Sequence, residues 1–265
     1  MFQFPTIFDW IERLAWLRGL PAAYLVLLTA FLIVVVWDWR VTVLALAVQY
    51  LAAGLLFVDV LDPRLAVVKL LVGWFICLML YFTARQVNWG RLPEDLTPDE
   101  AALLRPQDPQ VHIGRFQLSR SALVRLALAL AAAGTILFLG QRAAYQLPAV
   151  SGPLNLAIYA LGGMGLLGLS QTTEPLKAGA GLLTFMTGFE LFYNTLEQSA
   201  SMLVFLAAGN LVLTLAIAYL TQMRHTPPAV PTPVPPEEQP AVESAATESD
   251  GSSSSTKTDA RGALN

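Results

Sequence analysis

Long apolar runs with almost no charged residues constrain this chain more than any other feature of its sequence. Charged residues make up only 13% of the 265 residues, about half of the ~25% found in a typical soluble domain. Most of them fall in residues 91–125 and after residue 225. The rest of the sequence consists of runs of about 20 residues, the length that a helix needs to cross ~30 Å of hydrocarbon. The sequence therefore predicts an all-α, polytopic helical membrane protein.

About seven transmembrane helices are predicted from these runs. Pro21 opens the first run, where proline is tolerated because the first turn of a helix leaves its N–H groups unpaired. Three spans fall within residues 20–84 and four within 121–222. Between them, residues 85–120 are predicted to form a polar cytoplasmic loop with a short helix at Pro98–Leu104. The predicted spans are residues 20–37, 41–59, 64–84, 121–140, 153–171, 177–197 and 201–221.

The two ends of the chain differ from these runs and from each other. Residues 1–19 combine aromatic and charged side chains, which favours a short helix in the membrane interface with Trp10 and Trp16 at the headgroups. A flexible terminus with scattered aromatic residues is the alternative. Residues 223–265 have few large apolar side chains, so they cannot bury enough surface to offset the entropy of ordering. They are predicted to form a disordered tail, whose proline-rich part is either a docking segment or a solvated spacer.

The distribution of lysine and arginine predicts the orientation in the membrane. With seven spans, the connecting segments alternate between the two sides, and the cytoplasmic ones carry the excess of these residues. The set that contains Arg40, residues 85–120, Lys177 and Arg224 is much the richer. We therefore expect a multi-pass protein of the cell inner (plasma) membrane, with its N-terminus outside and its C-terminus in the cytoplasm.

Two carboxylates interrupt the sixth predicted span. Glu190 lies inside an almost wholly apolar stretch, and Glu197 follows seven residues later. Seven residues are nearly two helical turns, so both side chains are expected on one face. An ionisable residue at membrane depth is costly, and it is by default a candidate functional site. Polar residues on or near the same face are Thr184, Thr187, Tyr193, Asn194 and Ser201.

The functional interpretation of Glu190 is a proton-carrying site. A medium of low dielectric constant disfavours the charged form of a carboxyl group, which can then exchange a proton near neutral pH. The alternative is a polar contact between helices that another side chain satisfies. Glu197 has a further alternative, because it lies near the end of the span and can reach the membrane interface.

Lys69 is the other charged residue deep in an apolar run. It either extends toward the Arg64 end of its helix, or it faces the bundle and there pairs with a carboxylate or modulates a proton path. Gln49, Tyr50 and Asn210 are uncharged polar residues in other predicted spans. They are expected to hydrogen-bond across helices.

The sequence has no pattern typical of an enzyme, a metal site or a nucleic-acid-binding protein. The glycines of Gly163–Gly168 match GxGxxG, but no strand precedes them, so they predict close helix packing and not a nucleotide site. Cys77 is the single cysteine, and neither His112 nor His225 has a partner at a metal-ligand or catalytic spacing. The net charge of −3 does not suggest nucleic acid as a partner. We expect no cofactor and a non-catalytic role.

Residues 153–222 carry a pattern found in a known family. Gly188, Glu190 and Asn194 fit G-x-E-x-x-x-N in the sixth predicted span, and Ala207–Asn210 is a stretch of small residues in the seventh. In these features the segment resembles the small three-helix K subunit of respiratory complex I. The resemblance implies a C-terminal three-helix module of that type.

A longer stretch, residues 20–222, resembles the E-type membrane component of the hydrogenase-four group. That family has an arginine and a glutamine in its second span, which Arg40 and Gln49 match. It has a lysine and an Ala-Arg pair in its third span, which Lys69 and Ala84–Arg85 match at a different separation. Each motif is short, and the resemblance depends on their shared order.

The resemblance implies a non-catalytic subunit that packs beside large antiporter-like membrane subunits and helps to carry protons or sodium ions. By that resemblance Glu190 would be the intramembrane glutamate. We expect Lys69 and Glu197 to act as modulators, and the supporting polar groups to be Gln49, Thr187, Asn194 and Asn210. Asn210 stands where the family has a second carboxylate, and an amide cannot titrate. Either Glu197 substitutes for that carboxylate, or part of the relay is lost and the chain is mainly structural.

Two other functions fit the sequence. A scaffold or assembly subunit would have the same fold without ion transfer. An independent carrier of a small solute would act without partners. An enzyme that acts on lipid is a remote third, because the sequence contains no recognisable pair of nucleophile and base.

Overall fold

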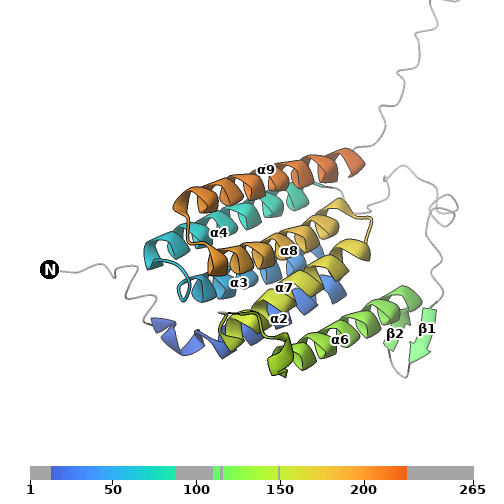
Figure 1. Cartoon of the computed structure of the whole chain (residues 1–265). Coiled ribbons are helices and arrows are strands. Elements are labelled where there is room, and N and C mark those ends of the chain that lie inside the picture. Colours follow the sequence, from blue (N-terminus) through green and yellow to red (C-terminus); the bar gives the residue numbers. More distant parts are fainter. Residues whose placement is uncertain (1–12, 88–109, 114–115, 149, 226–265) are drawn as a thin grey trace, which may run out of the picture. The chain divides into compact units, whose positions relative to one another are not determined.

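Helices make up most of the part of the chain that the structure, a computed structural model, describes: residues 13–87, 110–113, 116–148 and 150–225. Seven α-helices lie in these ranges (Figure 1), at the positions of the seven predicted apolar runs. They are α2 (Leu20–Val35), α3 (Trp39–Phe57), α4 (Pro63–Gln86), α6 (Arg120–Gln141), α7 (Gly152–Ser170), α8 (Pro175–Leu196) and α9 (Ala200–His225). Two 3-10 turns, η1 (Ala15–Leu17) and η2 (Ala143–Tyr145), precede α2 and α7.

Five of the described helices are long and apolar enough to cross a membrane, namely α3, α4, α6, α7 and α9. Helix α2 is apolar but has only 16 residues. Helix α8 has 22 residues, among them the charged Lys177 and Glu190 and several hydroxyl and glycine residues, and it lies outside the five. The chain thus has the helices of a multi-pass membrane protein.

Three of the sequence predictions concern residues outside the described ranges: the first part of the interfacial helix, residues 1–12, the short helix at Pro98–Leu104, and the tail after residue 225. Of the predicted polar loop, residues 110–113 and 116–119 form an antiparallel hairpin of strands β1 (Gln110–Ile113) and β2 (Phe116–Ser119), with Gln110 opposite Ser119. Apolar and polar residues alternate along both strands, which is the pattern of a strand with two different faces. The hairpin is an addition to the predicted loop.

Proline marks the start of four helices. Pro21, Pro63, Pro153 and Pro175 occupy the first or second position of α2, α4, α7 and α8, where the missing N–H group costs no hydrogen bond. At α3 the side chain of Asp38 instead accepts a hydrogen bond of 2.9 Å from the backbone N–H of Arg40. The starts of these helices therefore coincide with residues that favour a helix N-terminus, and such residues can be recognised in the sequence.

The backbone of helix α8 packs closely against four other helices, α2, α3, α7 and α9. Helix α7 packs along it most extensively, and α4 lies between α3 and α9, as the ribbon shows (Figure 1). Helix α6 packs against α7 and α2. Large apolar side chains such as Phe75 on α4 and Phe205 on α9 are exposed, as expected for helix faces that contact lipid. The arrangement turns the polar face of α8 away from that surface.

Glycines bring α7 and α8 into close contact. A Cβ atom added at Gly165 of α7 would lie 2.5 Å from the backbone nitrogen of Phe185, and one added at Gly181 of α8 would lie 2.7 Å from the backbone nitrogen of Leu169. Gly188 likewise has no room for a Cβ beside Leu161. The contact is of the small-residue type that lets two membrane helices approach closely, as the glycine spacing in α7 predicts.

Replacing Gly165 by alanine should destabilise the protein by about 1–3 kcal/mol, because the added methyl group meets backbone that cannot move aside like a flexible side chain. The measurement is unfolding of the purified protein in mild detergent. Gly162→Ala is the matched control on the same helix, since nothing lies within 4 Å of a Cβ there. Equal stability of the two variants would contradict the close contact.

Candidate functional site

The buried polar side chains of α8 lie on one face of the helix. Thr184, Thr187, Glu190 and Asn194 are spaced by three or four residues, which places them along one side, and all four are buried. The sequence predicts this arrangement correctly for these four positions. The helix can carry them inside an apolar bundle because Gly181 and Gly188 pack against α7 on another side.

Glu190 forms a buried ion pair with Lys69. The Nζ atom of Lys69, from α4, meets Oε2 of Glu190, and the two side chains are only 6% and 3% exposed. Asn210, from α9, donates a hydrogen bond of 3.0 Å from Nδ2 to the other carboxylate oxygen, Oε1. Three helices therefore meet at one carboxylate, and Lys69 faces the bundle instead of extending toward Arg64.

The pair is surrounded by apolar packing. Removing two charges from water costs several kcal/mol per ion, and only close pairing and further hydrogen bonds offset this cost. Asn210 supplies such a bond to the carboxylate. The ring of Phe57 has its centre 5.8 Å from the Lys69 nitrogen, within the range of a cation–π contact. Separating the two partners would leave a charge in an environment with little to solvate it.

A small cavity of about 10 Å³ lies beside the ion pair. This is close to the minimum that holds one water molecule. Its lining includes Tyr50, Thr187 and Asn210 together with Lys69 and Glu190, so a water molecule there would have the two to four polar partners that buried water needs. The site thus has space for one mobile hydrogen-bonding group next to the carboxylate.

The remaining polar groups of this face make weaker connections. Gln49 of α3 donates a hydrogen bond of 3.2 Å to Thr184 Oγ1, which links α3 to α8. Asn194 donates instead to the backbone carbonyl of Glu190, at 2.7 Å, and Thr187 to that of Leu183, at 2.8 Å. The supporting residues thus divide into Gln49 and Asn210, which bridge helices, and Asn194 and Thr187, which bond within α8.

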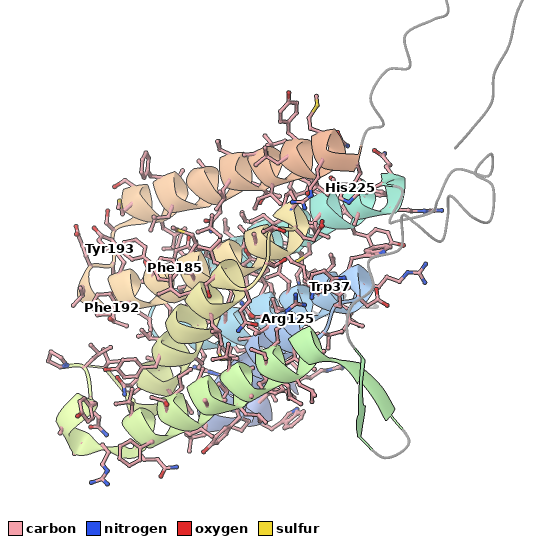
Figure 2. All side chains as sticks on the ribbon, turned by 90° about the vertical axis from the view of Figure 1, so that its right-hand side faces the viewer. Trp37, Arg125, Phe185, Phe192, Tyr193 and His225 are labelled. Atoms are coloured by element: carbon pink, nitrogen blue, oxygen red, sulfur yellow. The ribbon has the colours of Figure 1, made fainter. Side chains whose placement is uncertain are left out.

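Glu197 lies apart from this cluster. Helix α8 ends at Leu196, and Glu197 has an extended backbone with φ −142° and ψ 120°. The two-turn spacing therefore does not align it with Glu190, because the alignment requires a continuous helix through both residues. Glu197 is exposed and accepts a hydrogen bond of 2.8 Å from the hydroxyl of Tyr193, which Figure 2 shows at one end of the bundle. Ser201, also exposed, is likewise outside the cluster.

A second group of charged side chains lies at the opposite end of α8, and no spacing in the sequence predicts that its members meet. The ring of Trp37 is 4.7 Å from the Lys177 nitrogen and 4.1 Å from the Arg125 guanidinium carbon, and Figure 2 shows Trp37 and Arg125 close together. Lys177 also donates to the backbone carbonyl of Val36. Two cations, from α6 and α8, thus contact one aromatic ring that follows the end of α2. The only sequence signal is the aromatic and charged run that begins at Trp37.

Metal-binding chemistry has no support in the described residues, where no group of three or more His, Cys, Asp or Glu side chains is positioned to hold an ion. Comparison of the chain with models of protein families, with curated proteins and with solved structures found no match.

Removing one partner of the ion pair should destabilise the protein more than removing both. Lys69→Met and Glu190→Gln each leave one buried charge without its partner, and each should lower the free energy of unfolding by about 3–5 kcal/mol. The double variant buries no such charge and should be more stable than either single variant. Unfolding in detergent measures the cycle, with Glu197→Gln as an exposed control. Additive losses would contradict the pairing.

Proposed function

We propose that the chain is an integral membrane subunit of a complex I-like or hydrogenase-type assembly, and that it contributes to the translocation of protons or sodium ions through Glu190. The observation that supports this most strongly is the ion pair between Lys69 and Glu190, buried among apolar helices with Asn210 on the second carboxylate oxygen. Charged residues within membrane helices are costly, and they mark ion pathways and proton relays.

The geometry suggests how the carboxylate would respond to a proton. Protonation of Glu190 neutralises the carboxylate and removes its attraction to the ammonium group of Lys69, whereas deprotonation restores that attraction, which is strong in a medium of low dielectric constant. The cavity beside the pair has room for a group that carries the proton to or from the carboxylate. In this proposal Lys69 modulates the proton affinity of Glu190.

The resemblance supports the assignment to a multi-subunit assembly. Lys69 and Glu190 match the lysine and the glutamate of two separate family motifs, and in this chain their side chains are partners. Asn210, which stands where the family has a second carboxylate, donates to Glu190. We propose that Asn210 orients the carboxylate and that the relay in this chain contains one acid. Glu197, exposed at the end of α8, would at most modulate it.

The membrane topology is part of the same proposal. Helices α2 and α8 would cross the membrane together with the five longer or more apolar helices, which gives seven spans and a K-subunit-like module formed by α7, α8 and α9. The excess of lysine and arginine then assigns the C-terminus to the cytoplasm and the N-terminus to the outside of the inner (plasma) membrane. Large antiporter-like subunits would pack against the exposed apolar faces.

A structural subunit without ion transfer is the second candidate, and one observation favours it. Both oxygens of Glu190 have side-chain partners, from Lys69 and Asn210, so the site also satisfies the requirements of a purely structural contact between three helices. The two candidates predict different effects of a variant that keeps the shape of Glu190 and removes its ability to titrate.

Glu190→Gln should abolish or strongly reduce ion translocation by the assembly. The tagged chain is captured with its partners in mild detergent, the partners are identified by mass spectrometry, and the assembly is reconstituted into liposomes. Electron transfer and ion uptake are then measured together. Ion uptake should fall at least tenfold in Glu190→Gln, while electron transfer is less affected and Glu197→Gln behaves like the wild type.

Two outcomes would contradict the proposal. Unchanged ion uptake with Glu190→Gln, in an assembly that contains the variant, would leave only the structural role. Capture of the chain without any membrane partner, together with solute transport by the chain alone, would instead support an independent carrier.

A further inference from the structure

A large groove lies on the surface between α3 and α4. Its volume is about 1170 Å³, above the 300–1,000 Å³ typical of small-molecule pockets. Much of its wall consists of apolar side chains that are exposed, including Leu44, Leu71, Phe75 and Leu78. The ion pair of Lys69 and Glu190 does not line it. The groove is therefore a separate feature of the protein surface.

One end of the groove is positively charged. Arg40 lies in the first turn of α3, and Arg85 lies in the last turn of α4. The two helices are antiparallel neighbours joined by a short connection, so these turns lie at the same end of the bundle, and both arginines line the groove. Neither has an ion-pair partner in the part of the chain that the structure describes. Asp38, the nearby acid, accepts from the backbone N–H of Arg40.

Aromatic rings lie at the same level as the two arginines. Trp39 and Tyr81 line the groove with ring centres 5.9 Å apart, and the guanidinium of Arg40 lies over the ring of Trp39. Tryptophan and tyrosine are enriched at the boundary between hydrocarbon and headgroups. Beyond this level the lining is apolar, from Leu44 to Trp74. The groove thus has a cationic end at the depth of the headgroups and an apolar part at the depth of the acyl chains.

We infer that this groove binds an anionic phospholipid. Its phosphate would contact Arg40 and Arg85, because guanidinium groups form strong, directional hydrogen bonds with phosphate oxygens. Its acyl chains would lie along the apolar wall between α3 and α4. Basic pockets between membrane helices on the cytoplasmic side bind anionic headgroups. A helix of another subunit would fill the apolar part, but the two arginines make a phosphate the better match for the charged end.

The inference does not depend on ion translocation, since the arginines and the ion pair are in different parts of the bundle. If the groove holds a lipid, α3 and α4 present a lipid-covered face to the rest of any assembly. The partner subunits would then contact other faces of the chain, among them the exposed apolar face of α9.

The test is native mass spectrometry of the full chain from nanodiscs that contain equal amounts of phosphatidylglycerol and phosphatidylcholine. The wild type should retain phosphatidylglycerol in preference. Removing both arginines in Arg40→Gln/Arg85→Gln should reduce that retention about tenfold or more, because the phosphate loses its hydrogen bonds with both guanidinium groups. Arg64→Gln/Arg142→Gln removes the same charge elsewhere and should retain the lipid.

A second variant tests the apolar part of the site. Leu78→Trp places a larger side chain in the groove wall and should reduce retention of phosphatidylglycerol without lowering the unfolding temperature.

Equal loss of lipid in the two double arginine variants would mean attraction to net charge alone and would overturn the inference. Displacement of the lipid by inorganic phosphate, or retention unchanged by Leu78→Trp, would mean a headgroup site without an acyl groove and would also overturn the inference. Retention unchanged in Arg40→Gln/Arg85→Gln would overturn it outright and favour a partner helix in the groove.

Discussion

A charge buried in an apolar bundle must have a partner, and the fold meets this requirement at Glu190. The carboxylate is held by Lys69 from α4 and by Asn210 from α9. Its two oxygens thus connect α8 to α4, which is distant in the sequence, and to α9, which follows α8 directly. The energy that such a pair contributes to stability is small compared with the cost of breaking it. The ion pair therefore specifies which helices must meet, and it places a titratable group where a proton pathway would need one.

The close contact between α7 and α8 allows the ion pair to lie inside the bundle. Gly165 and Gly181 let the two backbones approach, so α8 can be surrounded by neighbours although its own composition is the least suited to lipid. Its polar face then meets α3, α4 and α9, which supply Gln49, Lys69 and Asn210. The aromatic contact of Trp37 with Lys177 and Arg125 holds the other end of the helix. Helix α8 is therefore held in the bundle both by close packing of its glycines and by the polar contacts of its buried side chains.

Much of the helical framework could be predicted from the sequence, because apolar length and proline position are local signals. The seven described helices lie at the predicted runs, and Glu190 stands out for its chemistry alone. The pairing of Lys69 with Glu190 could not be predicted, since the sequence left open whether the lysine faces the bundle. For Glu197 the sequence allows a position beside Glu190 or one at the end of the span, and the exposed position follows because α8 ends one residue before it. The contact between Trp37 and Arg125 depends on tertiary packing, which no local pattern encodes.

The central claim is that the carboxyl group of Glu190 gains and loses a proton while the protein works. Infrared difference spectroscopy of the captured assembly in lipid, recorded during turnover, tests this directly. We expect a carboxyl band that appears in the wild type and in Glu197→Gln and is absent in Glu190→Gln. Ion translocation without any carboxyl band that depends on Glu190 would contradict the proton-carrying role, and the ion pair would then be a structural contact between helices.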